Sequence, residues 1–564
     1  MKIWRSNVVV LVIFLLAAII IGRLFYIQVL QGKFYSAQAL GQQSGFQEVT
    51  GNRGQIYFSK SKESLGAASS GDMKSLAINE DTYIVSAVPR MIKDREAFAA
   101  AAGKELKITK ADMLAKLKES DSYVIIKKNV GTSQADALKS LQLAGLTLES
   151  MASRYYPQEK LASQVVGFLG GKGMGQYGLE GYYEDMLAGK KGIQEQKRGL
   201  NLIGADALPA DLNGSDLYLT LDYNIQFEAE TLLAQAKKDI NIDSGQIIVI
   251  KPDTGRILAM AGYPSFDPNT YYQQHDLGIF QNSAVQKIFE PGSVFKPFTM
   301  AIALNEGKVN PETTFVDTGS AKIGPDTVYN FDRKSYGKQT MSGILEKSIN
   351  TGAVFVSQQF SHQTFMDYLE KFGFNDKTGI DQQGEVVSKN MLLKKGSDFG
   401  FATASFGQGI EMTPIQLIRS FAMFANGGHV VTPYLVDKIS HGGEESVTKP
   451  HLSDQVISQK TASEVTAMMI QVVERGFGNI AKIPGYYLAG KTGTAEVPFP
   501  DKKGYYPDRT IQSFIGFGPA LKPQFLILVK LDHPNVPKSA LSAAPIFKKI
   551  AQYIINYWQL PPDY

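Results

Sequence analysis

The sequence predicts an α+β protein with an N-terminal membrane helix, and three observations carry this prediction. Strand-like segments occur at residues 217–261 and again at residues 486–532. A helix-rich stretch, roughly residues 293–425, lies between them. Residues 6–22 carry no charge. Strands at both ends of a segment, with helices between them, indicate one sheet that joins the two ends.

The composition is that of a multidomain globular protein. With 564 residues, 44% hydrophobic and 20% charged, the chain is too long for one ordinary domain and too apolar to be disordered. The net charge of +4 is too weak to indicate nucleic-acid binding. The chain has no cysteine, and its six scattered histidines include no H-E-x-x-H pattern. The sequence therefore predicts no metal site and no other cofactor.

The N-terminal segment Ser6–Gly22 has the pattern of a single membrane span. As a helix, this uncharged stretch is roughly 25 Å long, close to the thickness of a bilayer core. A cleaved signal peptide is the alternative, but the only small-residue cleavage pattern, Ala37–Ala39, lies well past the apolar run. Lys2 and Arg5 precede the span, so the positive-inside rule places the rest of the chain outside the cytoplasm.

Residues 31–210 have mixed patterns and no residue that indicates catalysis. Glycines recur from Gly167 to Gly192, which favours tight turns and close backbone contacts. The remaining expectations for this part are a turn at Gly51–Gly54, an exposed loop at Lys60–Lys74, helices at Glu96–Gly103 and Lys110–Lys118, and a short strand at Tyr123–Ile126.

A second unit begins near Gly214 and contains the predicted sheet. Leu217–Leu221 has the pattern of a strand, and Asp222 can cap the helix that follows it through Glu230. Two apolar runs around a Pro-Asp-Thr-Gly turn predict a β-hairpin. The strands expected in this unit after the first are Gly245–Ile250, Arg256–Ala261, Tyr486–Val497, Gln512–Gly518 and Gln524–Asp532, and the chain ends in an amphipathic helix at Ala543–Trp558.

Ser293 and Lys296 form an S-x-x-K pattern that is suited to nucleophilic catalysis. If Ser293 opens a helix, Lys296 lies on the same face one turn later. Pro297 favours this register because proline is tolerated in the first turn of a helix. The helix N-terminus favours a developing oxyanion, and an uncharged lysine can take the proton of the serine.

Two further motifs follow in the same unit. In Ser348-Ile349-Asn350 the hydroxyl can relay a proton, and the amide can hold both a peptide group and the catalytic lysine. In the strand Lys491-Thr492-Gly493-Thr494 the two threonines point the same way and form, with the lysine, a site for a carboxylate. Gly493 has no side chain, so a ligand can approach the backbone.

Each motif alone is weak, because other copies occur. The alternatives are Ser59/Lys62, Ser335/Lys338 and Ser446/Lys449 for S-x-x-K, Ser388–Asn390 for S-x-N, and Lys377–Gly379 for K-T-G. Any single copy is most simply a surface triplet. Order and spacing favour the chosen set, since 55 residues separate Ser293 from Ser348 and 143 separate Ser348 from Lys491.

The segment Phe289–Pro297 closely resembles the active-site segment of penicillin-binding proteins, and the other two motifs complete the set shared with serine β-lactamases. Further similarity lies at Arg53–Ile56, Arg154–Pro157, Gly178–Glu180, Pro264–Asn269 and Phe406–Gly409, so it covers nearly the whole chain.

The chain is thus identified as a class B, monofunctional penicillin-binding protein. The resemblance implies three parts: a cytoplasmic tail and anchor at 1–30, an elongated mixed pedestal or dimerisation-like domain at 31–210, and a transpeptidase domain at 211–564 with an antiparallel sheet flanked by helices.

The resemblance also implies a mechanism. Ser293 attacks the D-Ala–D-Ala carbonyl of a peptidoglycan stem peptide, with Lys296 as general base. Ser348 and Lys491 pass the proton to the leaving group. The backbone N–H groups of Ser293 and Thr494 form the oxyanion hole. Asn350 binds the donor peptide, while Thr492 and Thr494 bind its carboxylate at the Gly493 backbone. β-Lactams are expected to acylate Ser293.

Two sites depart from the family pattern. Tyr57–Lys60 stands where an Asp-Arg-Asn-Gly turn is usual, and Ile349 occupies a position where a small residue is common. Ser348–Gly352 resembles the division-type segment more than the elongation-type one. The implied partners are a SEDS-family glycosyltransferase and other divisome or elongasome proteins, at the bacterial plasma membrane with the catalytic domain outside.

Other function classes remain as alternatives. A serine β-lactamase shares the three motifs, but no Glu-x-x-Leu-Asn segment follows Ser348 to supply a deacylating base. A non-catalytic divisome or elongasome scaffold would not need all motif residues intact. A bifunctional synthase would need glycosyltransferase segments that residues 31–210 do not contain.

Overall fold

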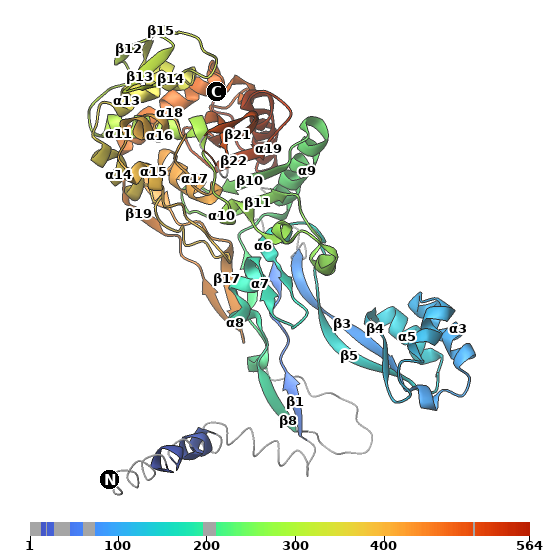
Figure 1. The fold of residues 1–564 in the computed structure, drawn as a ribbon. Helices are drawn as coiled ribbons and strands as arrows, with labels where there is room; N and C mark the ends of the chain where they lie inside the picture. The colour runs from blue at the N-terminus through green and yellow to red at the C-terminus, as the bar shows by residue number, and fades with distance from the viewer. Residues whose placement is uncertain are drawn as a thin grey trace. The chain divides into compact units, whose positions relative to one another are not determined.

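A computed structural model describes residues 13–17, 20–26, 46–59, 74–195, 210–499, 502 and 504–564 (Figure 1). The chain forms two compact units. The smaller is built from residues 1–54, 185–215 and 440–444, and it contains the antiparallel pair β1 (Phe46–Thr50) and β8 (Lys191–Glu195). All remaining residues form the larger unit.

The predicted membrane span at Ser6–Gly22 is described only at residues 13–17 and 20–22, and the predicted loop at Lys60–Lys74 only at Lys74. Within the ranges given above, no helix is both long enough and apolar enough to cross a bilayer.

The first part of the larger unit is a twisted sheet with helices packed on it. Strand β3 (Ser75–Ala87) pairs antiparallel with both β4 (Val124–Gly131) and β5 (Leu146–Tyr155). On the other side, β2 (Ile56–Tyr57) joins β3 to β9 (Asp216–Leu219), which is followed by β17 (Val436–His441). The helices here are α3 (Arg95–Leu106), α4 (Lys110–Lys116) and α5 (Thr132–Ser140), so the two predicted helices are confirmed.

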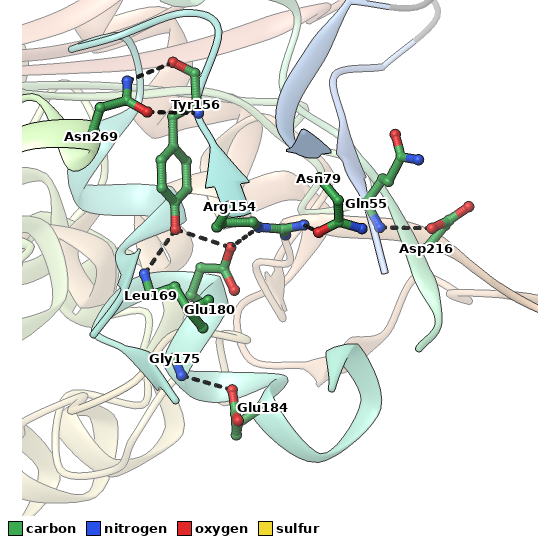
Figure 2. A network of polar contacts seen from close by, with 10 residues as sticks. All are labelled: Gln55, Asn79, Arg154, Tyr156, Leu169, Gly175, Glu180, Glu184, Asp216 and Asn269. Carbon is green, nitrogen blue, oxygen red and sulfur yellow. Dashed lines mark hydrogen bonds and ion pairs between the residues drawn. The ribbon is translucent and has the colours of Figure 1, made fainter. Parts of the chain in front are cut away.

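A buried polar network around one ion pair connects three of the segments that resemble the family (Figure 2). Arg154 on β5 lies 2.7 Å from Glu180 on α7 (Gly178–Tyr182), and the two side chains are 2% and 0% exposed. The Tyr156 hydroxyl donates to the same carboxylate and accepts from the Leu169 N–H. Asn269 exchanges hydrogen bonds with the Tyr156 backbone at 2.9 and 3.0 Å. Separating the two residues of a buried ion pair is strongly destabilising, because it leaves an uncompensated buried charge. The network therefore holds these segments together.

Close backbone packing explains the glycines of this region. Gly178 has φ +47°, and a Cβ there would lie 2.4 Å from the Val165 carbonyl oxygen. Gly167 has φ +78°, and a Cβ there would lie 2.3 Å from the Tyr177 carbonyl oxygen. The expectation of tight turns and close contacts is therefore confirmed.

The second part of the larger unit is built on a five-stranded antiparallel sheet with the order β11-β10-β22-β21-β20. Its strands are β10 (Ser244–Ile250), β11 (Ile257–Tyr263), β20 (Ala489–Pro498), β21 (Tyr505–Gly518) and β22 (Phe525–Asp532). Because β10 pairs with β22, the two ends of the unit share one sheet, and this prediction is confirmed.

One face of this sheet is covered by α9 (Tyr223–Ile240) and α19 (Ala543–Tyr557), which share a core with it (Figure 1). Asp222 caps α9 as predicted, because its carboxylate accepts from the N–H groups of Asn224 and Ile225. The helix continues past Glu230, the end expected from the sequence, to Ile240.

The middle of the unit is helix-rich, as predicted. Its helices are α10 (Ser283–Gln286), α11 (Lys296–Asn305), α12 (Met341–Glu346), α13 (Asn350–Ser357), α14 (His362–Lys371), α15 (Met391–Lys394), α16 (Asp398–Ala404) and α17 (Pro414–Phe421), and α18 (Gln459–Glu474) follows. Two short strand pairs were not predicted: β12 (Thr314–Asp317) with β15 (Gly337–Thr340), and β13 (Ser320–Ile323) with β14 (Asp326–Tyr329). The other short strands are β16 (His429–Val431), β18 (Glu444–Val447) and β19 (Leu452–Gln455).

Candidate active site

Ser293 lies in a tight turn that is fixed by its neighbours. Gly292 has φ +61°, and its N–H donates to the Gly407 carbonyl at 2.9 Å. Gly407 has φ +83°, and a Cβ there would lie 2.1 Å from the Gly292 carbonyl oxygen. Phe289 and Met412 exchange two backbone hydrogen bonds. The segments around Ser293 and Phe406–Gly409, both singled out in the sequence, therefore lie side by side.

The helix expected to open at Ser293 begins slightly later. Residues Gly292–Phe295 form a 3₁₀ turn, and α11 begins at Lys296 with Pro297 in its first turn. The Lys296 N–H still donates to the Ser293 carbonyl, so the turn leads directly into the helix. Ser293 itself is half-buried.

The Lys296 amine is held by the second motif rather than by Ser293. Its side chain is buried, with the residue 1% exposed. Within the described part of the chain, its Nζ donates to the Ser348 carbonyl at 2.5 Å, to Ser348 Oγ at 3.2 Å and to Asn350 Oδ1 at 2.8 Å. The S-x-x-K and S-x-N motifs therefore meet at this amine.

Ser348 stands between two lysines. It has φ +55°, an uncommon backbone conformation for a serine, in the short connection between α12 and α13. This conformation accompanies the approach of both its carbonyl and its hydroxyl to Lys296. Lys491 on β20 donates to the Ser348 hydroxyl at 2.9 Å. One hydroxyl thus connects all three motifs.

Burial makes a positive charge costly on either lysine. Burial, and next the charge of Lys491, hold the pKa of Lys296 well below its usual value of 10.5. Burial lowers the pKa of Lys491 to about 7. A lowered pKa favours the unprotonated amine, which is the form that can accept a proton from a nearby hydroxyl.

We expect penicillin acylation of this site to slow as the pH falls, because a protonated Lys296 cannot accept the serine proton. The second-order acylation rate constant, measured between pH 5 and pH 9, should fall as the pH is lowered through the neutral range, where Lys491, whose pKa burial lowers to about 7, gains a charge that acts on Lys296. The free energy of unfolding should also rise with pH. The unfolded chain binds more protons than the folded one between the lowered and the usual lysine pKa, so unfolding free energy rises with pH there. A rate constant that does not change over the measured pH range would contradict the expectation that protonation of the two lysines blocks acylation there.

The third motif lies on β20, directly beside the serine turn. A Cβ on Gly493 would lie 2.9 Å from Val294 Cγ1 and 3.0 Å from the Pro291 carbonyl oxygen. The nearest atom to such a Cβ is Ser513 Oγ on the neighbouring strand β21, at 2.4 Å, and the next two belong to the serine turn. The Thr492 hydroxyl lies 3.4 Å from Lys491 Nζ.

Thr494 is positioned by a residue that sequence reasoning did not identify. Its hydroxyl accepts from the Ser539 N–H at 3.3 Å and lies 3.4 Å from Ser539 Oγ. Ser539 is buried in a 3₁₀ turn just before α19. No motif marks it, because its contact depends on how the C-terminal segment returns to β20.

The other motif copies lie elsewhere and are engaged differently. The Thr378 hydroxyl of the second K-T-G triplet donates to Glu385 at 2.6 Å. Asn390 of the second S-x-N triplet accepts from the Glu411 N–H. Ser446 is exposed on β18. Among the copies in the described residues, only the set Ser293, Ser348 and Lys491 is brought to one place.

Comparison with known proteins agrees with this geometry. The model of the penicillin binding protein transpeptidase domain matches residues 245–552, which is more than half of the chain. The chain belongs to this family. The model of the penicillin-binding protein dimerisation domain matches residues 49–219.

Individual relatives resemble this penicillin-binding protein over most of their length. Stage V sporulation protein D of Bacillus subtilis is 32% identical over 489 residues, which is 84% of this chain and 75% of that protein. The peptidoglycan D,D-transpeptidase FtsI homolog of Mesostigma viride is 28% identical over 97% of this chain and 94% of its own. The sequence-based identification as a class B penicillin-binding protein is confirmed.

A solved structure shows the same fold. Penicillin binding protein 3 of Mycobacterium tuberculosis, crystallised with aztreonam, superposes with a TM-score of 0.70 at 26% identity. The match covers 92% of this chain and 98% of that one. The α+β transpeptidase fold on an N-terminal dimerisation domain, predicted from sequence, is therefore confirmed, and the chain carries the transpeptidase domain of an enzyme family.

Proposed function

We propose that this penicillin-binding protein is a serine D,D-transpeptidase that cross-links peptidoglycan stem peptides through an acyl-enzyme on Ser293. The observation that carries the proposal is the buried Lys296 amine. It lies one turn after the half-buried serine, has a lowered pKa, and is held by Ser348 and Asn350.

In the proposed acylation, Ser293 Oγ forms a bond to the carbonyl carbon of the penultimate D-Ala. The peptide bond to the terminal D-Ala breaks. Lys296 takes the serine proton. Ser348, which lies within hydrogen-bond distance of both lysines, passes a proton to the leaving amine. An amine of a second stem peptide then attacks the ester and restores the serine.

The remaining motif residues bind substrate in this proposal. Asn350 holds the donor peptide through its amide, and Thr492 and Thr494 hold the donor carboxylate beside the Gly493 backbone. The backbone N–H groups of Ser293 and Thr494 form the oxyanion hole. β-Lactams, which mimic D-Ala–D-Ala, acylate the same serine and inhibit the enzyme. No cofactor takes part.

The cellular setting is proposed on sequence grounds. Residues 1–30 form a cytoplasmic tail and single-pass anchor in the bacterial plasma membrane, residues 31–210 a pedestal, and residues 211–564 an extracytoplasmic catalytic domain. The partners are a SEDS-family glycosyltransferase and other divisome or elongasome proteins. The Ser348–Gly352 segment favours a role in division.

An exchange assay tests the activity. The full chain in detergent micelles is incubated with a peptide ending in D-Ala–D-Ala and a second D-amino acid. We expect release of D-Ala and a peptide that ends in the added amino acid, and a stable adduct with benzylpenicillin. Hydrolysed penicillin without an adduct would favour the β-lactamase alternative. Neither exchange nor adduct would favour the non-catalytic scaffold.

A further inference from the structure

Helix α13, which begins with Asn350, has no cap from its own sequence. The residue at its N-cap is Ile349, whose side chain is apolar and buried and makes no capping hydrogen bond. Helix N-termini carry N–H groups that need an acceptor. Here the acceptor comes from 20 residues earlier, since Asn330 Oδ1 accepts from the N–H of Asn350 at 3.0 Å and of Thr351 at 3.2 Å.

A buried carboxylate holds Asn330 in this position. Asn330 Nδ2 donates to Asp317 Oδ2 at 2.9 Å, and the Thr351 hydroxyl donates to Asp317 Oδ1 at 2.6 Å. Asp317 also accepts from the N–H groups of Gly319 and Tyr336, at 2.9 and 2.8 Å. Asp317 and Asn330 are 1% and 3% exposed. A fully satisfied buried polar network of this kind specifies one arrangement.

The same segment orients the Asn350 amide. Asn350 Nδ2 donates to the carbonyl of Tyr329, the neighbour of Asn330, at 3.0 Å. This contact turns Asn350 Oδ1 toward Lys296 Nζ, which lies at 2.8 Å. Strand β14, which Asn330 directly follows, thus connects to the catalytic lysine in two hydrogen bonds, one between Tyr329 and Asn350 and one between Asn350 and Lys296.

We propose that Asn330 and Asp317 are positioning residues for acylation, which supply from outside α13 the cap that Ile349 cannot provide. They hold the turn from Ser348 to Asn350 against Lys296. The inference rests on the proposed function, since it concerns the same reaction.

The test compares Asn330→Ala with the wild type, both as the full chain in detergent micelles. A fluorescent penicillin reports the acylation rate, and thermal unfolding reports stability. We expect the saturating acylation rate of Asn330→Ala to fall about 10- to 100-fold, because small displacements of catalytic groups have effects of that order. The acylation rate of Asp317→Asn should fall similarly. Each carboxylate oxygen of Asp317 accepts from two donors, and replacing either oxygen by NH₂ leaves those two donors without an acceptor.

Asn426→Ala is the matched control. Asn426 accepts one backbone N–H, where Asn330 accepts two, and it donates to two carbonyls; its partners are His429 and Pro252. We expect a comparable loss of stability with an unchanged acylation rate. Equal acylation losses in both asparagine variants would show that Asn330 has only a structural role and would overturn the inference. A wild-type acylation rate in Asn330→Ala would overturn it as well.

A second-site variant tests the capping argument. Serine is a strong N-cap residue, so Ile349→Ser can supply a local acceptor at the start of α13. The Asn330→Ala loss, measured in the Ile349→Ser background, should shrink about fivefold. An undiminished loss would contradict the capping role. If the wild type itself took up no penicillin, the proposed function would fail instead.

Discussion

Replacement of Ser293 by alanine is expected to abolish acylation by benzylpenicillin. The hydroxyl of Ser293 is the only group that the proposed mechanism uses to form the ester, and neither Lys296 nor Ser348 replaces it in this role. Removing a serine nucleophile costs on the order of 10⁶-fold in rate in a well-studied hydrolase. Intact-protein mass spectrometry should show one adduct on the wild type and none on Ser293→Ala.

Ser446→Ala is the control for this prediction. Ser446 belongs to another S-x-x-K pattern, with Lys449, and it is exposed on β18. Its replacement should leave the adduct unchanged. An adduct of the same mass on Ser293→Ala would show that the nucleophile is a different residue, and peptide mapping would locate it.

The features predicted correctly share strong local signals. The strands of the main sheet are runs of apolar residues, such as Phe525–Asp532, whose side chains are almost all buried. Such runs are recognisable from sequence because burial on both faces removes the polar alternation. Asp222 was identifiable as a cap because an aspartate preceded a helical pattern.

The features that were missed depend on partners distant in sequence. Strand β5 (Leu146–Tyr155) has no fully buried residue, and β3 carries Asn79, Glu80 and Asp81 in its middle. Neither has the apolar pattern of a strand, and their pairing with each other stabilises both. The four-residue strands β12, β13, β14 and β15 also lack a run of apolar residues. The Asp317–Asn330 network beside them could therefore not be anticipated from sequence.

The candidate site was also predicted only in part. Motif order placed Ser293, Ser348 and Lys491 in one site, and the structure brings their segments together. The sequence did not indicate that Lys296 would be hydrogen-bonded to the Ser348 carbonyl, because that contact requires the φ of +55° at Ser348. Backbone conformations of this kind are set by tertiary packing rather than by residue type.

The second large effect is expected at Lys296. Lys296→Met should lower the acylation rate constant by about 10² to 10⁴-fold, the usual contribution of a general base. Methionine has a similar length and is suited to the buried stem of the lysine. Stopped-flow measurement with a fluorescent penicillin gives the rate. Lys377→Met, at the exposed lysine of the second K-T-G triplet, is the control and should react as the wild type does.

A smaller loss of acylation rate in Lys296→Met would indicate that another group is the general base. The Ser348 hydroxyl lies 3.2 Å from Lys296 and 2.9 Å from Lys491, so it connects the two lysines and offers Lys491 as the alternative base. If Lys296→Met retained more than about a tenth of the rate, short of the usual general-base contribution, Lys491 would be the main base. Lys296 would then hold Ser348 and Asn350 in place, since its three hydrogen bonds all go to that motif.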